Sequence, residues 1–212
     1  MSTTIRPATA ADRDFVAWTI LAASRSHLPR GAWDISLDAP EPDVLAFIER
    51  LTRVEPATFC HWRGFLLAEV DGTPAAALSA YDAARVADVD AAVASELSAM
   101  DWTPEQMLAA DARFKPFLTC VPDQPAGTWI VEWVATRPEF RRRGLVDALL
   151  EEILARGRRA GYRDAQISIL MGNDPARRAY EKTGFTLQRE RTHPEFAELM
   201  GCPGIAQYGR TL

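Results

Sequence analysis

The sequence of 212 residues contains few cysteines, few lysines and no long apolar run. Its three cysteines lie far apart and form no C-x-x-C pair, so they favour neither a disulfide framework nor a zinc site. No stretch approaches the ~20 apolar residues that a membrane helix needs. The N-terminal segment lacks the apolar region of a secretory signal. We therefore expect a cytoplasmic protein with no membrane span and no metal site.

The charge balance argues against a general nucleic-acid-binding protein. The formal net charge is −5, whereas neutralising nucleic-acid phosphates requires a positive face. Only two of the 24 basic residues are lysine, and many of the arginines lie between Arg137 and Arg191. Hydrophobic residues make up 48% and charged residues 25%, which is typical of a globular chain and excludes general disorder.

Hydrophobic periodicity predicts one α/β domain over residues 1–212. The predicted strands are 4–8, 65–70, 75–81, 129–136, 165–170, 185–189 and 205–212. One predicted helix begins after Thr9, which can cap it. The other predicted helices outside the insertion cover 44–51, 144–160 and 174–182. The remaining segments are a loop at 27–42 and an insertion at 82–127, with helices in 83–100 and 104–112 and a loop over 116–125. Strand–helix alternation after residue 128 predicts a parallel strand pair with a right-handed crossover.

The junction between a predicted strand and a predicted helix at residues 138–147 has the composition of an anion site. Arg141, Arg142 and Arg143 precede Gly144, where the helix begins. The first turn of a helix presents free backbone N–H groups and the positive end of the helix dipole, and glycine lets a ligand approach the backbone. A pyrophosphate suits such a site. The alternative is a solvated, basic helix start.

A second motif follows at the next predicted crossover, and the two segments together resemble the GNAT superfamily of acyl-coenzyme A-dependent N-acyltransferases. The first family signature, [QR]-x-x-G-x-[GA], corresponds to residues 141–146. The second, N-x-x-A-x-x-x-Y-x-x-x-G-F, is matched at Asn173, Ala176, Tyr180, Gly184 and Phe185.

The resemblance implies a fold and an activity. The expected fold is a mixed, strongly twisted sheet with a splayed central parallel strand pair, helices on both faces and a helical insertion at about 82–127. The coenzyme A-binding core is expected at about 128–190. The expected activity is transfer of an acetyl or similar acyl group from acetyl-CoA to a primary amine by direct attack in a ternary complex. The alternatives are a non-catalytic acyl-CoA-binding module of the same fold and, ranked last, an arginine-lined nucleic-acid-binding face.

The resemblance also implies which residues hold acyl-CoA. They are Val134, Ala135, Thr136, Arg141, Arg142, Arg143, Gly144, Leu145, Val146, Asn173, Ala176 and Tyr180. The pantetheine arm would pair with the backbone of Val134 and Thr136, as an added strand does. Val146 departs from the first signature, which has Gly or Ala there, and its branched side chain would crowd the pyrophosphate. Asn173 would bind the arm, hold the splayed strand or cap the following helix.

Two residues are expected to carry the proton transfers. Tyr180 matches the family tyrosine that gives a proton to the departing thiolate. Its alternative is a packed helix tyrosine whose hydroxyl is in water. Glu132 is the expected base because strand alternation puts it on one face with Val134 and Thr136. Glu69, or a water chain without a direct base, stays open.

The sequence leaves the amine acceptor and the assembly open. The acceptor is a small molecule or a peptide, and Trp33 and Trp102, in the two variable segments, are candidates for contact with it. The histidines His27, His61 and His193 fall in predicted loops and are expected to be surface or packing residues. A homodimer formed through the C-terminal strand is a further hypothesis.

Overall fold

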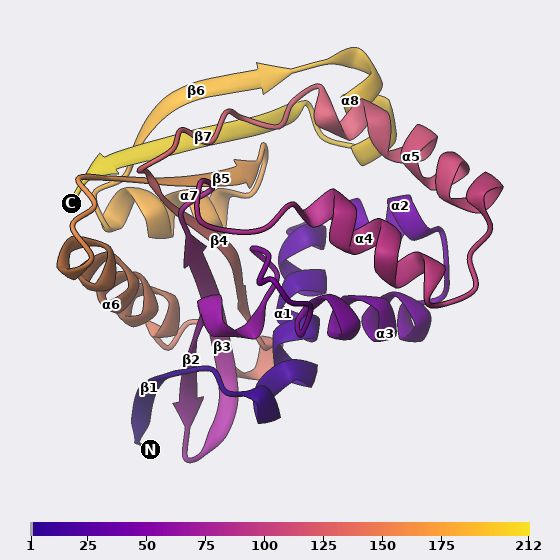
Figure 1. Ribbon diagram of the computed structural model, residues 1–212. Coiled ribbons are helices and arrows are strands. Elements are labelled where there is room, and N and C mark those ends of the chain that lie inside the picture. Colours follow the sequence, from indigo (N-terminus) through magenta and orange to yellow (C-terminus); the bar gives the residue numbers. More distant parts are fainter. Residues whose placement is uncertain (1) are drawn as a thin grey trace.

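The structure is a computed structural model that describes residues 2–212. A seven-stranded sheet with helices on both faces forms its frame (Figure 1). The strands, in the sheet order β1-β2-β3-β4-β5-β7-β6, are β1 (Thr3–Pro7), β2 (Phe65–Val70), β3 (Thr73–Tyr81), β4 (Trp129–Thr136), β5 (Asp164–Leu170), β6 (Thr186–Thr192) and β7 (Gly204–Thr211). The helices are α1 (Arg13–Arg25), α2 (Ala32–Leu37), α3 (Glu41–Leu51), α4 (Val89–Ser98), α5 (Pro104–Leu118), α6 (Leu145–Arg159), α7 (Asp174–Lys182) and α8 (Pro194–Met200). The predicted mixed α/β class is confirmed.

The hairpin of β2 and β3 forms where the sequence predicts it. Asp71 and Gly72 both have positive φ angles, 49° and 81°, as a two-residue type I′ turn requires. The turn sets β2 antiparallel to β3, and β1 adds to the outer edge of β2. These strands form the N-terminal half of the sheet, against which β4 pairs.

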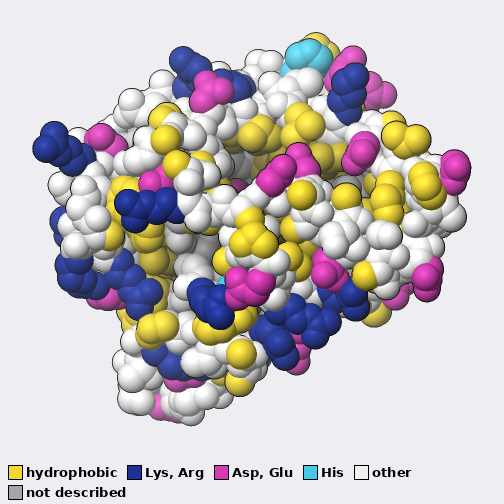
Figure 2. All heavy atoms as spheres, viewed as in Figure 1, with side chains coloured by type: hydrophobic (Ala, Val, Ile, Leu, Met, Phe, Trp, Pro, Cys, Tyr) yellow, Lys and Arg dark blue, Asp and Glu magenta, His cyan; other side chains and the backbone are white. Residues whose placement is uncertain are grey.

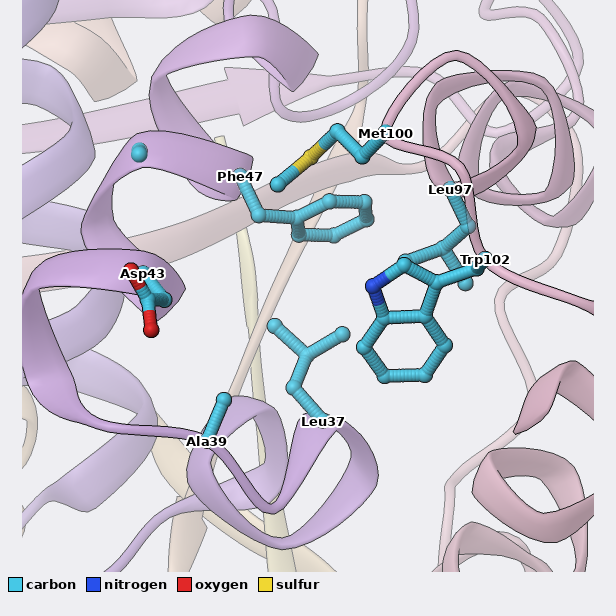
Figure 3. Close-up of a pocket in the computed structure, with 8 residues that line it drawn as sticks. Leu37, Ala39, Asp43, Phe47, Leu97, Met100 and Trp102 are labelled. Atoms are coloured by element: carbon cyan, nitrogen blue, oxygen red, sulfur yellow. The ribbon is translucent and has the colours of Figure 1, made fainter.

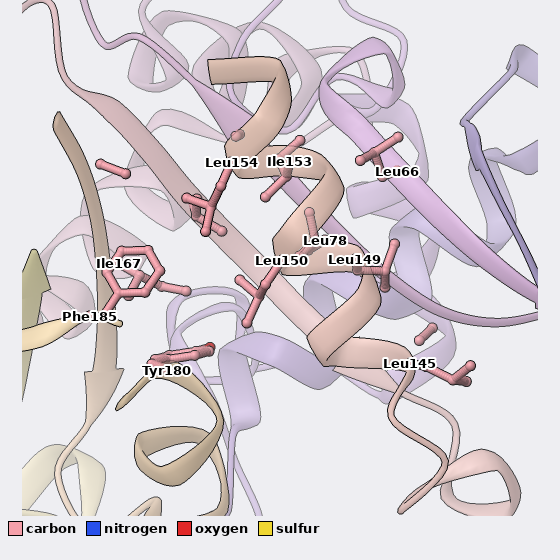
Figure 4. Close-up of a cluster of buried hydrophobic side chains, with 14 of the residues drawn as sticks. Leu66, Leu78, Leu145, Leu149, Leu150, Ile153, Leu154, Ile167, Tyr180 and Phe185 are labelled. Atoms are coloured by element: carbon pink, nitrogen blue, oxygen red, sulfur yellow. The ribbon is translucent and has the colours of Figure 1, made fainter. Parts of the chain in front are cut away.

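Helix α6 packs its apolar stripe on the sheet (Figure 4). Leu149, Leu150, Ile153 and Leu154 recur at helical spacing and are at most 1% exposed. Each buried aliphatic side chain of this size stabilises the fold by roughly 1.5–3 kcal/mol relative to leaving it exposed. The stripe therefore holds the whole helix, including its first turn, in a fixed position on the sheet.

The two faces of the sheet carry different helices. Tyr180 of α7 joins α6 on one face. Phe15 of α1 and Phe47 of α3 pack on the other face, against Leu67 of β2. A third cluster joins α2, α5 and α8 near the ends of β5 and β7. Alternating strand side chains thus bury both faces of the sheet.

The parallel neighbours β4 and β5 pair along only part of their length. Their registered pairs are Trp129–Ala165, Ile130–Gln166 and Val131–Ile167, although β4 continues to Thr136. Beyond these pairs, β4 stays bonded to β3 and β5 to β7. The strands therefore diverge, and the splayed central parallel pair implied by the family resemblance is confirmed.

Several helices differ from the sequence prediction. The predicted loop 27–42 contains α2, whose start is held by the Gly31 amide donating to Asp34 Oδ2 at 2.8 Å. In the insertion, α4 begins at residue 89 rather than 83. Helix α5 extends past residue 112 to 118 and contains Pro116, which lacks the backbone N–H that would bond to the preceding turn. Helix α8 was not predicted. Short helices such as α2 and α8 carry too few turns to show periodicity, and tertiary packing stabilises them.

The C-terminal strand is internal to the sheet. β7 lies between β5 and β6 and pairs with both. The predicted route to a homodimer through this strand is therefore wrong, because β1 and β6 form the sheet edges. Within residues 2–212, no helix combines the length and the apolar character needed to cross a membrane.

Candidate active site

Glu132 stands where β4 and β5 separate, as the first β4 residue beyond their last pair. The next residue, Trp133, has a φ of 53°. At this point the register of β4 against β3 shifts, so that Trp133 and Val134 together lie opposite Leu78. An extra residue in one strand is a β-bulge, a feature common beside active sites.

The bulge overturns the predicted shared face of Glu132, Val134 and Thr136. Val134 packs against the α6 cluster. Glu132 instead accepts a hydrogen bond from Tyr81, and Trp133 packs in the cluster of α1 and α3. An extra residue inverts the side-chain alternation that follows it. Glu132, which precedes the bulge and lies opposite Ser79, faces the α1 side of the sheet, and the inversion after the bulge places Val134 on the α6 side.

The backbone of β4 beyond the bulge faces the open side of the fork. The Arg137 amide donates to the Ala75 carbonyl of β3 at 2.9 Å. Because backbone groups alternate in direction along an antiparallel strand, those of Val134 and Thr136 point away from β3, into the gap. Ala135, between them, pairs with β3. The buried Thr136 Oγ1 has no hydrogen-bond partner within residues 2–212.

The arginine loop leads into α6 through two left-handed residues. Arg142 has a φ of 63° and Gly144 a φ of 73°, and a Cβ at Gly144 would meet open space. The N–H groups of the first α6 turn have no acceptor inside the helix. Arg141 Nε donates to the Thr136 carbonyl at 3.4 Å, which links the loop to the end of β4. Val146 packs against the α6 cluster, so its side chain is held by the core and not by the loop.

Asn173 caps α7 and ties it to α1. Its Oδ1 accepts a hydrogen bond from the Ala176 amide at 3.2 Å, and its Nδ2 donates to Ser26 Oγ at 2.6 Å. Ser26 follows α1 and has a φ of 57°. Of the roles left open for Asn173, the helix cap is therefore observed. The bond to Ser26 additionally fixes the chain after β5 against α1.

Tyr180 lies near the end of α7 and packs in the α6 cluster, with its hydroxyl directed away from Phe185 (Figure 4). The two ring centroids are 6.3 Å apart. Burial raises the pKa of Tyr180 above its ordinary value, so the phenol stays protonated at neutral pH. Tyr180 and Glu132 consequently lie on opposite faces of the sheet.

Glu132 is half-buried and hydrogen-bonded. The Tyr81 hydroxyl, at the end of β3, donates to Glu132 Oε2 at 2.6 Å, and Gln124 Nε2 donates to the Tyr81 oxygen at 2.9 Å. Burial raises the pKa of Glu132 to about 7, against the opposing effect of the Tyr81 hydrogen bond. A carboxyl group with a pKa near neutrality is suited to proton transfer at pH 7.

Sequence reasoning missed Tyr81 and Gln124. Tyr81 ends a predicted strand, but only the pairing of β3 with β4 places it beside Glu132, and no local pattern encodes that pairing. Gln124 lies in a predicted loop whose residues carry no periodicity. The aromatic ring of Phe59 stacks between Tyr81 and Trp133, at 5.4 and 5.7 Å, and completes this side of the site.

Glu69, the alternative base, and the three histidines lie in other surroundings. Glu69 pairs with Arg6 at 2.6 Å on the outer part of the sheet. His61 is buried and its Nδ1 accepts from a backbone amide, while His193 caps α8, so both serve local structure. His27 is exposed. Residues 2–212 contain no cluster of three or more His, Cys, Asp and Glu side chains arranged to hold a metal ion.

Acidic neighbours pair with two arginines of the hypothetical nucleic-acid face. Arg177 lies 3.1 Å from Asp174 and 3.4 Å from Glu181, and Arg159 lies 2.8 Å from Glu152. Figure 2 shows basic and acidic side chains interspersed over the face in view. This mixture does not form the continuous positive area that phosphate binding along a nucleic acid requires.

The two candidate acceptor tryptophans lie among the helices. Trp102 lines an apolar pocket of about 190 Å³ between α2, α3 and α4, in which it lies near Leu37 and Leu97 (Figure 3). Trp33 packs on Phe47 of the same pocket, with ring centroids 5.9 Å apart. None of the residues lining the pocket comes from β4, β5 or the arginine loop. The structure therefore does not bring these tryptophans to the fork.

Fold and site together define an acyltransferase-type architecture, in which parallel strands open beside the first turn of a helix. The sequence over residues 33–185 matches the Acetyltransferase (GNAT) family. Because this match covers most of the chain, the protein belongs to the GNAT acetyltransferase family.

Solved structures share this fold over nearly the whole chain. A crystal structure of an acetyltransferase superposes with a TM-score of 0.70 at 18% identity and covers 98% of each chain. An N-acetyltransferase from Staphylococcus aureus Mu50 gives 0.64 at 18% identity, covering 99% of this chain and 100% of that one. YncA from Salmonella typhimurium, solved with its cofactor acetyl-CoA, gives 0.52 at 17% identity, covering 100% and 95%. No curated relative matches the sequence.

The raised pKa of Glu132 predicts a pH-dependent penalty on stability. Its pKa rises from 4.5 in the unfolded chain to about 7 in the folded protein, so the folded state binds the proton more tightly. Stability is therefore lost as pH rises through this window. Replacing Glu132 with Gln removes the loss. The free energy of unfolding of Glu132→Gln relative to wild type should therefore rise by about 3 kcal/mol between acid and mildly alkaline pH.

Urea denaturation across this pH range measures the effect. The exposed Glu198→Gln is the control and should track the wild type. Parallel stability curves for Glu132→Gln and wild type would contradict the raised pKa.

Proposed function

We propose that this acetyltransferase moves the acetyl group of acetyl-CoA to a primary amine, which attacks directly in a ternary complex. The observation that carries the proposal is the fork between β4 and β5. Its gap contains the strand backbone of Val134 and Thr136, and the arginine loop lies at the end of β4. The similarity to an N-acetyltransferase and to an acetyl-CoA-bound structure supports the same assignment.

The residues present fit an acyl-CoA substrate. The backbone groups of Val134 and Thr136 are directed into the gap, where a pantetheine arm pairs with them as a strand would. Leu145 and Val146 turn their side chains into the core, which leaves the first-turn amides for the pyrophosphate. The exposed side chains of Arg141, Arg142 and Arg143 add positive charge at the same place.

Placing Glu132 and Tyr180 on opposite faces of the sheet suits the two proton transfers. An ammonium with a pKa of ~10.4 is not a nucleophile, so the amine first loses a proton to Glu132. The amine then forms the C–N bond from the Glu132 side, and backbone N–H groups of β4 stabilise the oxyanion. The C–S bond breaks on the other face, where Tyr180 donates its proton to the sulfur. After the attack the nitrogen loses its second proton to solvent, and the Tyr180 phenolate takes one proton back. Glu132 then releases its own proton to solvent, so that the reaction releases one proton in total.

A thiol-release assay with acetyl-CoA and a panel of primary amines tests this function. We expect amine-dependent release of CoA thiol, with kcat rising with pH around the Glu132 pKa of about 7 because the base acts when deprotonated. The comparison arm is calorimetric binding of CoA without an amine. Tight CoA binding without turnover on any amine would instead favour the non-catalytic binding module.

Substituting Tyr180 tests its role as proton donor. Tyr180→Phe keeps the buried ring and removes the hydroxyl, so kcat should fall by roughly 10²–10⁴ with little change in CoA affinity. Tyr208→Phe, which alters another buried tyrosine of the same cluster, is the control and should retain kcat. If Tyr180→Phe has wild-type kcat, Tyr180 is not the donor.

Substituting Gly144 tests the phosphate loop. Gly144→Val places a branched side chain where the φ is 73° and the pyrophosphate approaches, so the Kd for CoA should rise at least tenfold, as measured by calorimetry. Gly161→Val is the matched control, because Gly161 has a φ of 89° at the other end of α6 and also faces open space. Both variants carry backbone strain. Equal losses of CoA affinity in the two would remove the loop from the binding site.

A further inference from the structure

The insertion returns to the sheet through residues 121–127, here called the strap. The strap runs back beside β7 and then enters β4 (Figure 1). Gln166 of β5 and Gln207 of β7 both donate to the Asp123 carbonyl, at 3.0 and 3.2 Å. Arg191 of β6 donates to Asp123 Oδ2 at 2.5 Å. Side chains from three strands therefore hold the middle of the strap on the sheet.

The end of the strap is held separately. The Gly127 amide donates to Asp82 Oδ1 at 3.2 Å, next to the end of β3, and the Tyr162 hydroxyl donates to Asp82 Oδ2 at 3.3 Å. Gln124 lies between the two sets of anchors. Its side chain reaches from the strap to the Tyr81 hydroxyl.

Hydrogen-bond chemistry sets the direction of the chain from Gln124 to Glu132. The Gln124 Nε2 group only donates, so the Tyr81 oxygen accepts from it at 2.9 Å. The single Tyr81 proton is then directed to Glu132 Oε2 at 2.6 Å, a distance typical of a hydrogen bond to a carboxylate. One carboxylate oxygen is thereby occupied, and the other, Oε1, remains for the amine.

We propose that Tyr81 and Gln124 are positioning residues for Glu132, and that the insertion serves the reaction by supplying Gln124 through the strap. The inference rests on the proposed function, because it assigns both residues to the base of that reaction. Neither residue touches the reacting atoms. They act by fixing the plane of the Glu132 carboxyl group and by stabilising its charged form.

Two titratable groups act on Glu132 from the neighbouring elements, Tyr81 on β3 and Cys60 ahead of β2. Burial raises the pKa of Tyr81 and of Cys60, and the Glu132 charge adds to both shifts. Both groups therefore stay neutral while Glu132 titrates. A change in the Glu132 midpoint then reports the hydrogen-bond chain and not a second ionisation.

Carboxyl ¹³C NMR of the full chain with labelled glutamate tests the proposal without requiring turnover. The Glu132 signal is identified by its loss in Glu132→Gln. Tyr81→Phe keeps the ring that stacks on Phe59 and removes the donor. We expect the titration midpoint to rise by about one pH unit, because a hydrogen bond to the charged form is lost.

Two further variants calibrate this result. Gln124→Met keeps the chain length and removes the donor to Tyr81, so the midpoint should rise by a smaller amount. Tyr162→Phe is the matched control, because it removes a tyrosine donor to Asp82 and leaves the Glu132 chain intact. In active enzyme, the midpoint of the pH dependence of kcat should also rise, more in Tyr81→Phe than in Gln124→Met, and should stay unchanged in Tyr162→Phe.

Each outcome decides the inference. An unchanged midpoint in Tyr81→Phe overturns it, and so does an equal shift in Tyr162→Phe. If Tyr81→Phe does not fold, the exposed Gln124→Met takes its place. An unchanged Glu132 midpoint in Gln124→Met would then overturn the inference. A further outcome is that the midpoints shift as expected in the variants while the wild type releases no CoA thiol with any amine. The absence of thiol release would refute the proposed function, whereas the shifted midpoints would still support the action of Tyr81 and Gln124 on Glu132.

Discussion

The separation of β4 from β5 after three registered pairs is the constraint on which the site depends. Backbone N–H and C=O groups require partners, and those on the open side of β4 find none in a neighbouring strand. The separation is held from outside the fork. β3 and β7 bond the outer edges of the two strands, and Asn173 links the end of β5 to Ser26 after α1. The proposed acyl-CoA substrate would complete the sheet, as an added strand does, where the protein leaves it incomplete.

The bulge at Trp133 gives this opening two chemically different sides. Without it, Val134 would share with Glu132 the face beside α1. With it, Val134 lies under α6 with Tyr180, while Glu132 keeps its place beside Tyr81 and the aromatic rings near α1. In the proposed reaction, this separation lets the base act on the entering amine from one face and the acid act on the departing sulfur from the other. One extra residue in β4 therefore separates Val134 from the face that carries Glu132.

The insertion at 82–127 combines helical packing with support of the site. Its helices α4 and α5 bury side chains against α3 and α2, while its return segment is bonded to β5, β6 and β7. Anchoring on three strands limits the motion of Gln124 and thus of the Tyr81 hydroxyl. Rigid support of this kind matters for a general base, because its reach to the amine is set within a few tenths of an ångström.

Local sequence patterns by themselves determined the elements with strong signals. These are the Asp71-Gly72 turn, the apolar stripe of α6, the start of that helix at Gly144 and the Asn173 cap of α7, because each depends on neighbours a few residues away. Only the tertiary structure decided which face Glu132 occupies, that β7 is internal, and that Tyr81 and Gln124 meet the carboxyl group. Those features arise from the register between strands and from contacts between residues more than 40 positions apart. Such pairings produce no periodic pattern in the sequence from which they could be predicted.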